Sequence, residues 1–333
     1  MERNSPPIGP VGGGDRRADS LSALPGLLDK RMIFVTGKGG VGKTTAAAAL
    51  GLVAARQGKR TIVCEVSQQE RMSRAFRREG VGFEESEIAP NLYAISIDPQ
   101  RAQEEYLRVQ IRSKALYSVL FSNRIFQYLA AATPGLREMV TMGKIWELAQ
   151  LERKWVKAAP YDLVVVDAPA TGHGLGMLRT PRTFRDIART GPIRNQADQI
   201  HAFIVSPKQT GVVVVALPEE MPVNETLDFR RMLDEDMGMK LDAIVVNGLY
   251  PERFNGAEAE RIADAQAAAA DGSADALRAA LSEHHRARAQ RVQLRRLRRE
   301  AGDQVATLPF LFEPELDFDD FERLSRELEK KLL

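Results

Sequence analysis

The sequence is short of cysteine, of long apolar runs and of net charge, and each shortage excludes a class of protein. Its single cysteine, Cys64, cannot form a disulfide within the chain, and one thiolate cannot build a Cys-based zinc site. The apolar runs are all too short to cross a bilayer, which takes about 20 residues. The net charge of +2 over 333 residues gives no overall preference for nucleic acid or for an acidic surface.

The first 29 residues differ in composition from the rest of the chain. Residues 1–29 are rich in Pro, Gly and Ser and have little apolar periodicity, which predicts a disordered tail. They lack the continuous apolar core of a secretory signal, so we expect a cytoplasmic protein, with peripheral attachment to the membrane as an alternative. Hydrophobic residues make up 44% of the chain and charged residues 28%, which is typical of a soluble globular domain. We expect that domain over residues 30–333.

A glycine-dense stretch between an apolar run and an Ala-rich run carries the clearest chemistry. It contains the pattern Gly-x-x-x-x-Gly-Lys-Thr, from Gly37 to Thr44, which is typical of a P-loop. Glycines let backbone N–H groups point at phosphate oxygens, and the following helix offers its N-terminus to the same anion. We predict that Lys43 contacts the β- and γ-phosphates of ATP and that Thr44 binds Mg²⁺. The predicted nucleotide-binding residues of this stretch are Gly37, Gly39, Gly40, Val41, Gly42, Lys43, Thr44 and Thr45.

A second chemical landmark follows a Val-rich run. The run from Tyr161 to Asp167 is continuous in apolar residues, which favours a strand buried on both faces of a parallel sheet. It ends in an acid, where a Walker B aspartate belongs, and we predict that Asp167 holds the Mg²⁺ shell through water. The Pro and Gly residues up to Gly174 predict a stiff but hinged loop that senses the γ-phosphate.

Short apolar runs recur along the chain and predict the sheet. They cover residues 33–36, 60–67, 91–99, 161–167, 211–217 and 242–247. Between the third and fourth runs, residues 100–157 have a helical pattern that is more apolar than helices on one face of a sheet require. We predict an α/β fold, a doubly wound and mostly parallel sheet of the P-loop NTPase kind, with an inserted helical subdomain at about residues 100–157. An ordinary helical layer is the alternative.

The region from residue 256 to residue 302 is rich in Ala, Arg and Glu. Its Arg-rich part, residues 286–299, is typical of a solvated helix face with i,i+4 ion pairs. Contact with nucleic acid or anionic lipid is the alternative, and the small net charge argues against nucleic acid as a partner.

An additional lysine in the P-loop points to one group of ATPases. Lys38 follows Gly37, and the resulting Gly-Lys-Gly-Gly-Val-Gly-Lys-Thr-Thr resembles the deviant Walker A motif of the MinD, ParA, nitrogenase-iron-protein and ArsA/Get3 group. The stretch Asp-Ala-Pro-Ala-Thr-Gly-His, from Asp167 to His173, resembles switch II of the ArsA/Get3 family. Later segments follow in the family's order, so the resemblance covers nearly the whole chain after residue 30. It is nearest to the single-unit bacterial proteins, including actinobacterial types that pair with a paralogue.

The resemblance implies an ATPase that works as a dimer. Lys38 would reach across the interface to the partner's nucleotide, and the partner would be an identical chain or a paralogous ATPase. Asn247 would read the adenine, with the backbone around Pro309 beside it; a strand-end cap is the alternative role for Asn247. The family's Cys-x-x-Cys pair, which binds zinc between protomers, has no counterpart in this chain.

The family's switch I carries an aspartate that orients the attacking water, and this chain departs from that pattern. A gap-free count back from Ala75-Phe76 places Ser67 at the position of that aspartate, with Glu65 two residues earlier. Two alternatives follow: Glu65 takes over the role, or the protein binds ATP and hydrolyses it slowly.

The resemblance does not decide which of three functions the ATPase serves. The first is the handling of a hydrophobic client, such as a tail-anchored membrane protein, in a groove built from residues 100–157. The second is energising an anion efflux pump, as ArsA does, although ArsA binds metalloid through several cysteines and this chain has one. The third is a ParA-like or MinD-like positioning role.

Overall fold

The protein is described by a computed structural model. It covers Leu24, residues 26–66, Met72, Phe76 and residues 81–110, 133–153, 158–188, 190–269, 272–302 and 304–332. Ser67 and residues 111–132 therefore lie outside the described residues.

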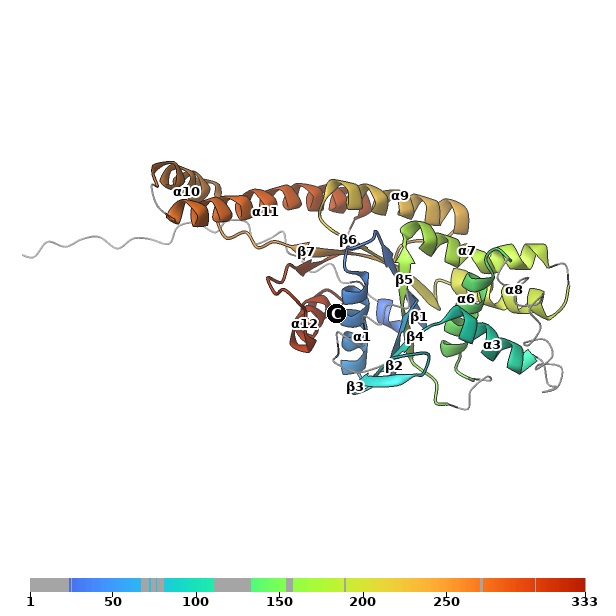
Figure 1. Ribbon diagram of the computed structural model, residues 1–333. Coiled ribbons are helices and arrows are strands. Elements are labelled where there is room, and N and C mark those ends of the chain that lie inside the picture. The colour runs from blue at the N-terminus through green and yellow to red at the C-terminus, as the bar shows by residue number, and fades with distance from the viewer. Residues whose placement is uncertain are drawn as a thin grey trace, which may run out of the picture.

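An eight-stranded sheet forms the centre of the molecule (Figure 1). Its spatial order is β3-β4-β2-β5-β1-β6-β7-β8, and every pair of neighbours is parallel except β3 with β4. The strands are β1 (Met32–Gly37), β2 (Thr61–Glu65), β3 (Ser86–Ala89), β4 (Leu92–Ser96), β5 (Leu163–Ala170), β6 (Thr210–Ala216), β7 (Ala243–Leu249) and β8 (Val305–Pro309). The predicted doubly wound, mostly parallel sheet is confirmed. The short antiparallel strand β3 was not predicted.

Helices cover both faces of this sheet. They are α1 (Lys43–Arg56), α3 (Pro99–Gln110), α6 (Leu136–Leu148), α7 (Thr171–Ile187), α8 (Pro192–Val205), α9 (Glu220–Met237), α10 (Gly256–Ala268), α11 (Ser273–Ala301) and α12 (Phe318–Leu332), with a short 3-10 turn η1 (Leu27–Asp29). Helices α1 and α12 pack on one face, and α6 to α9 pack on the other with the carboxyl-terminal half of α11. Helix α10 and the start of α11 extend beyond the sheet as a helical hairpin (Figure 1).

The protein has two hydrophobic cores, one on each face of the sheet, and they follow from the alternation of side chains along the strands. In β1, Met32 and Phe34 point to the α6–α9 face, whereas Ile33 and Val35 point to the α1 face. All four are completely buried. A strand with helices on both faces needs apolar residues at every position, and this explains the unbroken apolar runs in the sequence.

The predicted boundary of the amino-terminal tail differs from the structure. Leu24, Leu27 and Leu28 are buried in the core on the α1 face, and the backbone N–H of Leu24 donates to the carbonyl of Lys331 over 3.2 Å. The folded part of the chain therefore begins before residue 30. Residues 1–23 lie outside the described residues, and their disorder stays a prediction.

The described ends of residues 100–157 belong to the helical layer of the sheet. In α6, Met142, Ile145 and Leu148 are buried in the same core as Phe34. Helix α3 packs against α6. The middle of this region, residues 111–132, is not described, so the helical subdomain stays a prediction.

Strand β5 continues past Asp167, and this corrects the expected loop. The strand runs to Ala170, and α7 begins at Thr171 with no loop residue between them. Pro169 is tolerated in a central strand because the register with β1 is irregular there, so the ladder needs no N–H from it. Instead, the Pro169 carbonyl accepts a hydrogen bond of 2.8 Å from the Thr36 hydroxyl.

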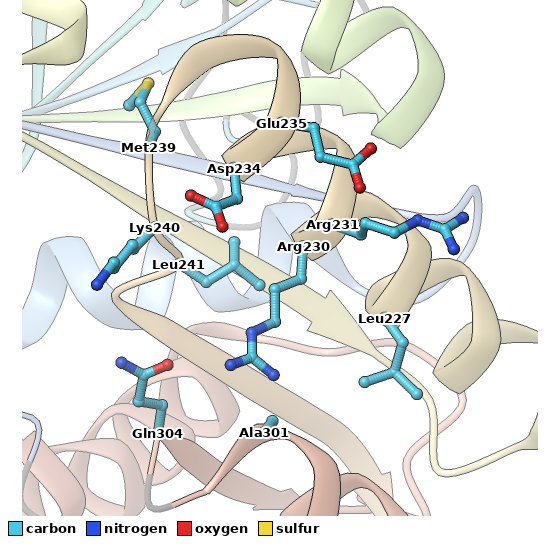
Figure 2. A pocket seen from close by; sticks show the side chains of 10 residues that line it. All are labelled: Leu227, Arg230, Arg231, Asp234, Glu235, Met239, Lys240, Leu241, Ala301 and Gln304. Atoms are coloured by element: carbon cyan, nitrogen blue, oxygen red, sulfur yellow. The ribbon is translucent and has the colours of Figure 1, made fainter.

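A cavity of about 700 Å³ lies at the amino-terminal edge of the sheet (Figure 2). It is lined by α9 side chains such as Arg230 and Asp234, by Leu241 just before β7 and by Gln304 just before β8. Ligands of open α/β sheets bind at the carboxyl ends of the strands. This cavity is at the opposite edge, so its size does not make it the nucleotide site.

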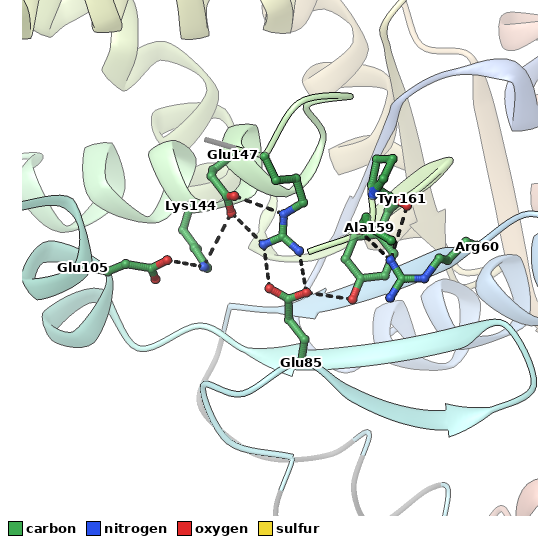
Figure 3. Close-up of polar contacts among 9 residues, drawn as sticks. Arg60, Glu85, Glu105, Lys144, Glu147, Ala159 and Tyr161 are labelled. Carbon is green, nitrogen blue, oxygen red and sulfur yellow. Dashed lines mark hydrogen bonds and ion pairs between the residues drawn. The ribbon is translucent and has the colours of Figure 1, made fainter. Parts of the chain in front are cut away.

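A buried ionic cluster joins the edge of the sheet to the helical layer (Figure 3). The Arg153 side chain is fully buried and donates to Glu85, which precedes β3, over 2.6 Å and to Glu147 of α6 over 2.9 Å. The Tyr161 hydroxyl donates to the same Glu85 carboxylate over 2.8 Å. Burial alone would raise the pKa of Glu85, but the hydrogen bonds from Arg153 and Tyr161 outweigh it and hold the pKa below its usual value.

Candidate functional site

The loop after β1 is shaped by glycines in conformations that other residues adopt only under strain. Gly37, Gly40 and Gly42 have φ angles of 153°, 83° and 90°, in the region that L side chains rarely adopt. A Cβ atom at Gly37 would lie 2.2 Å from the carbonyl oxygen of Val215, and one at Gly42 would lie 2.2 Å from Nδ2 of Asn247. The backbone therefore approaches its neighbours closely. The first turn of α1, from Lys43, follows at once and presents its backbone N–H groups to the loop.

The two residues predicted to hold Mg²⁺ are in direct contact. The Thr44 hydroxyl donates a hydrogen bond of 2.6 Å to Oδ2 of Asp167, which is only 4% exposed. A hydroxyl and a carboxylate are hard oxygen ligands of the kind that Mg²⁺ prefers. Mg²⁺ usually takes one or two protein ligands and completes its shell with phosphate oxygens and water, so this pair fits the ion.

Glu65 lies beside Asp167 at the carboxyl edge of the sheet. It is the last residue of β2, its register partner in β5 is Asp167, and it is 1% exposed. Residues in register on parallel strands point to the same face, and the alternation along β2 and β5 directs both carboxylates to the α1 face. The structure thus brings Glu65, Asp167 and Thr44 together. Ser67, the other predicted catalytic residue, lies outside the described residues.

The two lysines of the loop contact different groups. The Lys43 ammonium donates to the backbone carbonyl of Lys38 over 3.1 Å, which keeps it over the loop. The Lys38 ammonium points away to α9 and forms an ion pair of 2.8 Å with the Glu225 carboxylate. Lys43 therefore serves its own loop, whereas Lys38 faces outward. The contact between Lys38 and Glu225 was not predicted, because the two residues are far apart in the sequence and no local pattern indicates that they meet.

Asn247 connects the loop to the far half of the sheet. Its Nδ2 donates a hydrogen bond of 3.0 Å to the carbonyl of Val41. Pro309, the other residue predicted near the base, is the register partner of Leu249, two residues after Asn247. Immediately beyond, the rings of Tyr250 and Phe310 stack with their centroids 4.5 Å apart. The Asn247 side chain thus bonds the backbone of the glycine loop, and a stacked aromatic pair begins three residues later in the chain.

One further residue of this region was missed. Gln290 of α11 donates to the carbonyl of Gly248 over 3.1 Å and accepts from the N–H of Tyr250 over 2.8 Å. In the sequence it is one polar residue in a charged helix, and no spacing rule marks it.

Comparison with known proteins agrees with this geometry. The family model described as "Anion-transporting ATPase" matches residues 30–196 and 188–271. The chain belongs to the anion-transporting ATPase family. This family hydrolyses ATP, and the protein is an ATPase.

Curated members of the anion-transporting ATPase family differ in their names. The ATPase BagA of Mycobacterium tuberculosis is 31% identical over 263 residues, which are 75% of this chain and 73% of that protein. A putative arsenical pump-driving ATPase of Halobacterium salinarum is 28% identical over 239 residues, 68% of this chain and 36% of that protein. The ATPase get3 of Schizosaccharomyces japonicus is 27% identical over 275 residues, 69% of this chain and 80% of that protein.

Within the part of the chain that the structure describes, no helix is both long and apolar enough to cross a membrane.

Proposed function

We propose that this ATPase is a nucleotide-driven dimeric switch. Mg-ATP binds at the carboxyl ends of β1 and β5, between the glycine loop and the pair of Thr44 and Asp167, and ATP draws two protomers together face to face. Lys43 neutralises the β- and γ-phosphates of its own site, and Lys38 supplies a cation to the partner's site in the closed state. The base lies beside Asn247 and Pro309.

The observation that carries the proposal is the direction of the Lys38 side chain. A loop lysine that served its own phosphates would lie over the loop, as Lys43 does. Lys38 instead points to α9, where its side chain is 37% exposed. An outward cation at the tip of a phosphate loop is placed to meet a second molecule.

We propose that the molecule on which this ATPase acts is a hydrophobic client, such as a tail-anchored membrane protein. The apolar sequence of residues 100–157, which predicts a helical subdomain, supports this role. A relative named ATPase get3 covers most of this chain, which places both proteins in one family without naming the client.

The alternative is a subunit that energises an anion efflux pump, and the names of two relatives favour it. The thiol of this chain argues against a metalloid site of its own. Cys64 is fully buried in β2, and burial raises the pKa of the thiol above its usual value, so it is not available as a thiolate ligand.

The test is the mass of the protein in solution. Sedimentation of the full chain with Mg²⁺ and a non-hydrolysable ATP analogue should give a dimer, and the nucleotide-free protein should dissociate more readily. Lys38→Ala removes the cation that is proposed to act across the interface, and it should form this dimer less readily. Lys240→Ala, which replaces an exposed lysine at the opposite edge of the sheet, is the matched control. A monomer at every nucleotide concentration, with no paralogous chain from the same cells restoring a dimer, would refute the proposal.

A further inference from the structure

Strand β7 carries a bulge at the residues that face the glycine loop. Its pairing with β8 is regular up to Val246 with Thr307 and resumes at Leu249 with Pro309. Between these pairs β7 has Asn247 and Gly248, whereas β8 has only Leu308, so β7 contains one extra residue. Gly248 has a φ of 72°, which is a left-handed conformation that suits glycine at a bulge.

The bulge has a direct effect on Asn247. An extra residue bends a strand and redirects the side chain at that point. Here the Asn247 amide reaches the carbonyl of Val41 in the glycine loop. Beyond the bulge the Leu249 carbonyl accepts from the Phe310 N–H on the β8 side, so the next N–H, that of Tyr250, points to the opposite side of β7. On that side the pairing with β6 ends at Val246, and buried backbone groups beyond it need other partners.

Gln290 supplies those partners from helix α11. Its Nε2 donates to the Gly248 carbonyl over 3.1 Å, and its Oε1 accepts from the Tyr250 N–H over 2.8 Å. The side chain is 6% exposed, so water does not compete for these bonds. One amide thus holds the carbonyl and the N–H on either side of Leu249, in the way that a neighbouring strand would.

The position of Gln290 is itself fixed by packing. Leu294 and Leu297, one and two turns further along α11, are buried in the core with Ile244 and Val246 of β7. A second side chain of α11 supports the same segment, since Arg286 donates to the Tyr250 hydroxyl over 2.8 Å. The amide of Gln290 therefore meets β7 at a defined place rather than from a mobile surface.

We propose that Gln290 is a positioning residue of the nucleotide site, which holds the β7 bulge in the shape that turns Asn247 toward the base of a purine nucleoside triphosphate. This inference rests on the proposed function, because it takes Asn247 as the residue that meets the base. Gln290 itself touches neither the phosphates nor the glycine loop. Its loss must therefore weaken the part of the affinity that comes from the base and spare the part that comes from the phosphates.

Calorimetry with two ligands separates these parts. The full chain is titrated with Mg-ATP and with Mg-tripolyphosphate, and the ratio of the two affinities reports the contribution of the nucleoside. In Gln290→Leu we expect ATP to bind about tenfold more weakly and tripolyphosphate to change by less than about twofold, since the loss amounts to one or two hydrogen bonds. Gln293→Leu removes an amide one turn along the same helix and should leave both affinities unchanged.

A second variant covers the case in which Gln290→Leu does not fold. In Gln290→Glu, the ionised carboxylate accepts from the Tyr250 N–H but cannot donate to the Gly248 carbonyl. The protonated acid has both an O–H donor and an acceptor oxygen, so it can form both hydrogen bonds. The ratio of the ATP to the tripolyphosphate affinity in this variant, divided by the same ratio in the unmodified protein at each pH, should therefore recover as the pH is lowered.

Four results would overturn the inference. Equal losses for both ligands in Gln290→Leu, or a ratio in Gln290→Glu that follows the ratio of the unmodified protein at every pH, would show that Gln290 only supports the fold. If Gln293→Leu changed the ratio of the ATP to the tripolyphosphate affinity by a similar factor, the effect would not depend on the contact between Gln290 and the bulge. If the unmodified protein bound ATP no better than tripolyphosphate, the base site at Asn247 would fail first, and the inference with it.

Discussion

The ammonium of Lys38 lies 2.8 Å from the carboxylate of Glu225, and both side chains are about one-third exposed, 37% and 35%. Ion pairs with this exposure contribute about 0–1 kcal/mol. The contact is therefore weak enough to be exchanged for the nucleotide of another protomer, as the proposed closed dimer requires.

Removing the Glu225 charge should favour the closed dimer. In Glu225→Gln, Lys38 no longer has to leave a carboxylate, and we expect the dimer Kd with Mg-ATP to fall by up to about fivefold. Asp228→Asn removes an equivalent charge from an exposed pair with Arg231 on the same helix and should have no effect. The measurement is sedimentation equilibrium. A weaker dimer in Glu225→Gln would mean that the carboxylate supports the closed state.

Substitution of the two lysines of the glycine loop should impair different steps, ATP binding for Lys43 and turnover for Lys38. Lys43→Ala should lose most of its ATP affinity, because Lys43 lies over its own loop. Lys38→Ala should bind ATP almost normally while turnover falls by about 10²-fold or more, as happens when a cation acting in trans is lost. Calorimetry and steady-state ATPase rates test this pair. Equal losses of binding and turnover in Lys38→Ala would place Lys38 in its own site.

Hydrolysis by the protein alone should be slow. A serine at the predicted water-orienting position, Ser67, contributes far less than a carboxylate, a difference on the order of tens to thousands of fold in rate. Ser67→Asp should therefore raise the ATPase rate of the purified protein. In the cell, a paralogous ATPase with the aspartate would form the other half of the dimer.

The rival explanation uses Glu65, which lies beside Asp167 in the sheet. If the unmodified homodimer hydrolyses ATP briskly and Glu65→Gln abolishes this activity, Glu65 carries the role and the prediction of a weak site is wrong.

Arg153 should be among the most sensitive positions for stability. Arg153→Met leaves Glu147, which is 1% exposed, buried beside the remaining charges, and removing one partner of a buried pair costs about 3–5 kcal/mol of unfolding free energy. Arg179→Met breaks an exposed pair with Asp236 and should cost less than about 1 kcal/mol. Urea denaturation of the two variants measures the contrast, and similar losses would contradict it.

The same cluster predicts a loss of stability in acid. The pKa of Glu85 is lower in the folded protein than its usual value. At a pH between the folded and the unfolded pKa, the unfolded chain therefore binds more protons than the folded protein. Its contribution is complete above the unfolded pKa of about 4.3 and is lost as the pH falls through the folded pKa. Thermal melts from pH 6 downward should therefore show a steeper decline for the unmodified protein than for Glu85→Gln. Parallel curves would show that other carboxylates dominate.

The sequence predicted those parts of the molecule whose signal is local. The glycine loop, Thr44 and the acid at Asp167 were identified because phosphate and Mg²⁺ chemistry demand those residue types at those spacings. The sheet was predicted because strands buried on both faces require unbroken apolar runs.

The parts that were missed depend on contacts between distant residues. Glu85 joins Arg153 and Glu147 from a segment more than 60 residues earlier, and each of the three alone has the pattern of an ordinary surface charge. Gln290 is equally inconspicuous, because its role follows from a bulge in another strand. The expected loop after Asp167 was wrong because Pro and Gly favour loops in isolation, whereas here the β1–β5 irregularity accommodates Pro169 within the strand.

The direct junction between β5 and α7 determines how motion at Asp167 must spread. With no loop residue between Ala170 and Thr171, there is no slack to absorb a displacement of the strand end. Gly174, in the first turn of α7, packs so closely on Thr36 that a Cβ atom would lie 2.7 Å from its hydroxyl. We therefore expect a displacement of Asp167 to move α7 as a unit, together with α8, which packs along α7.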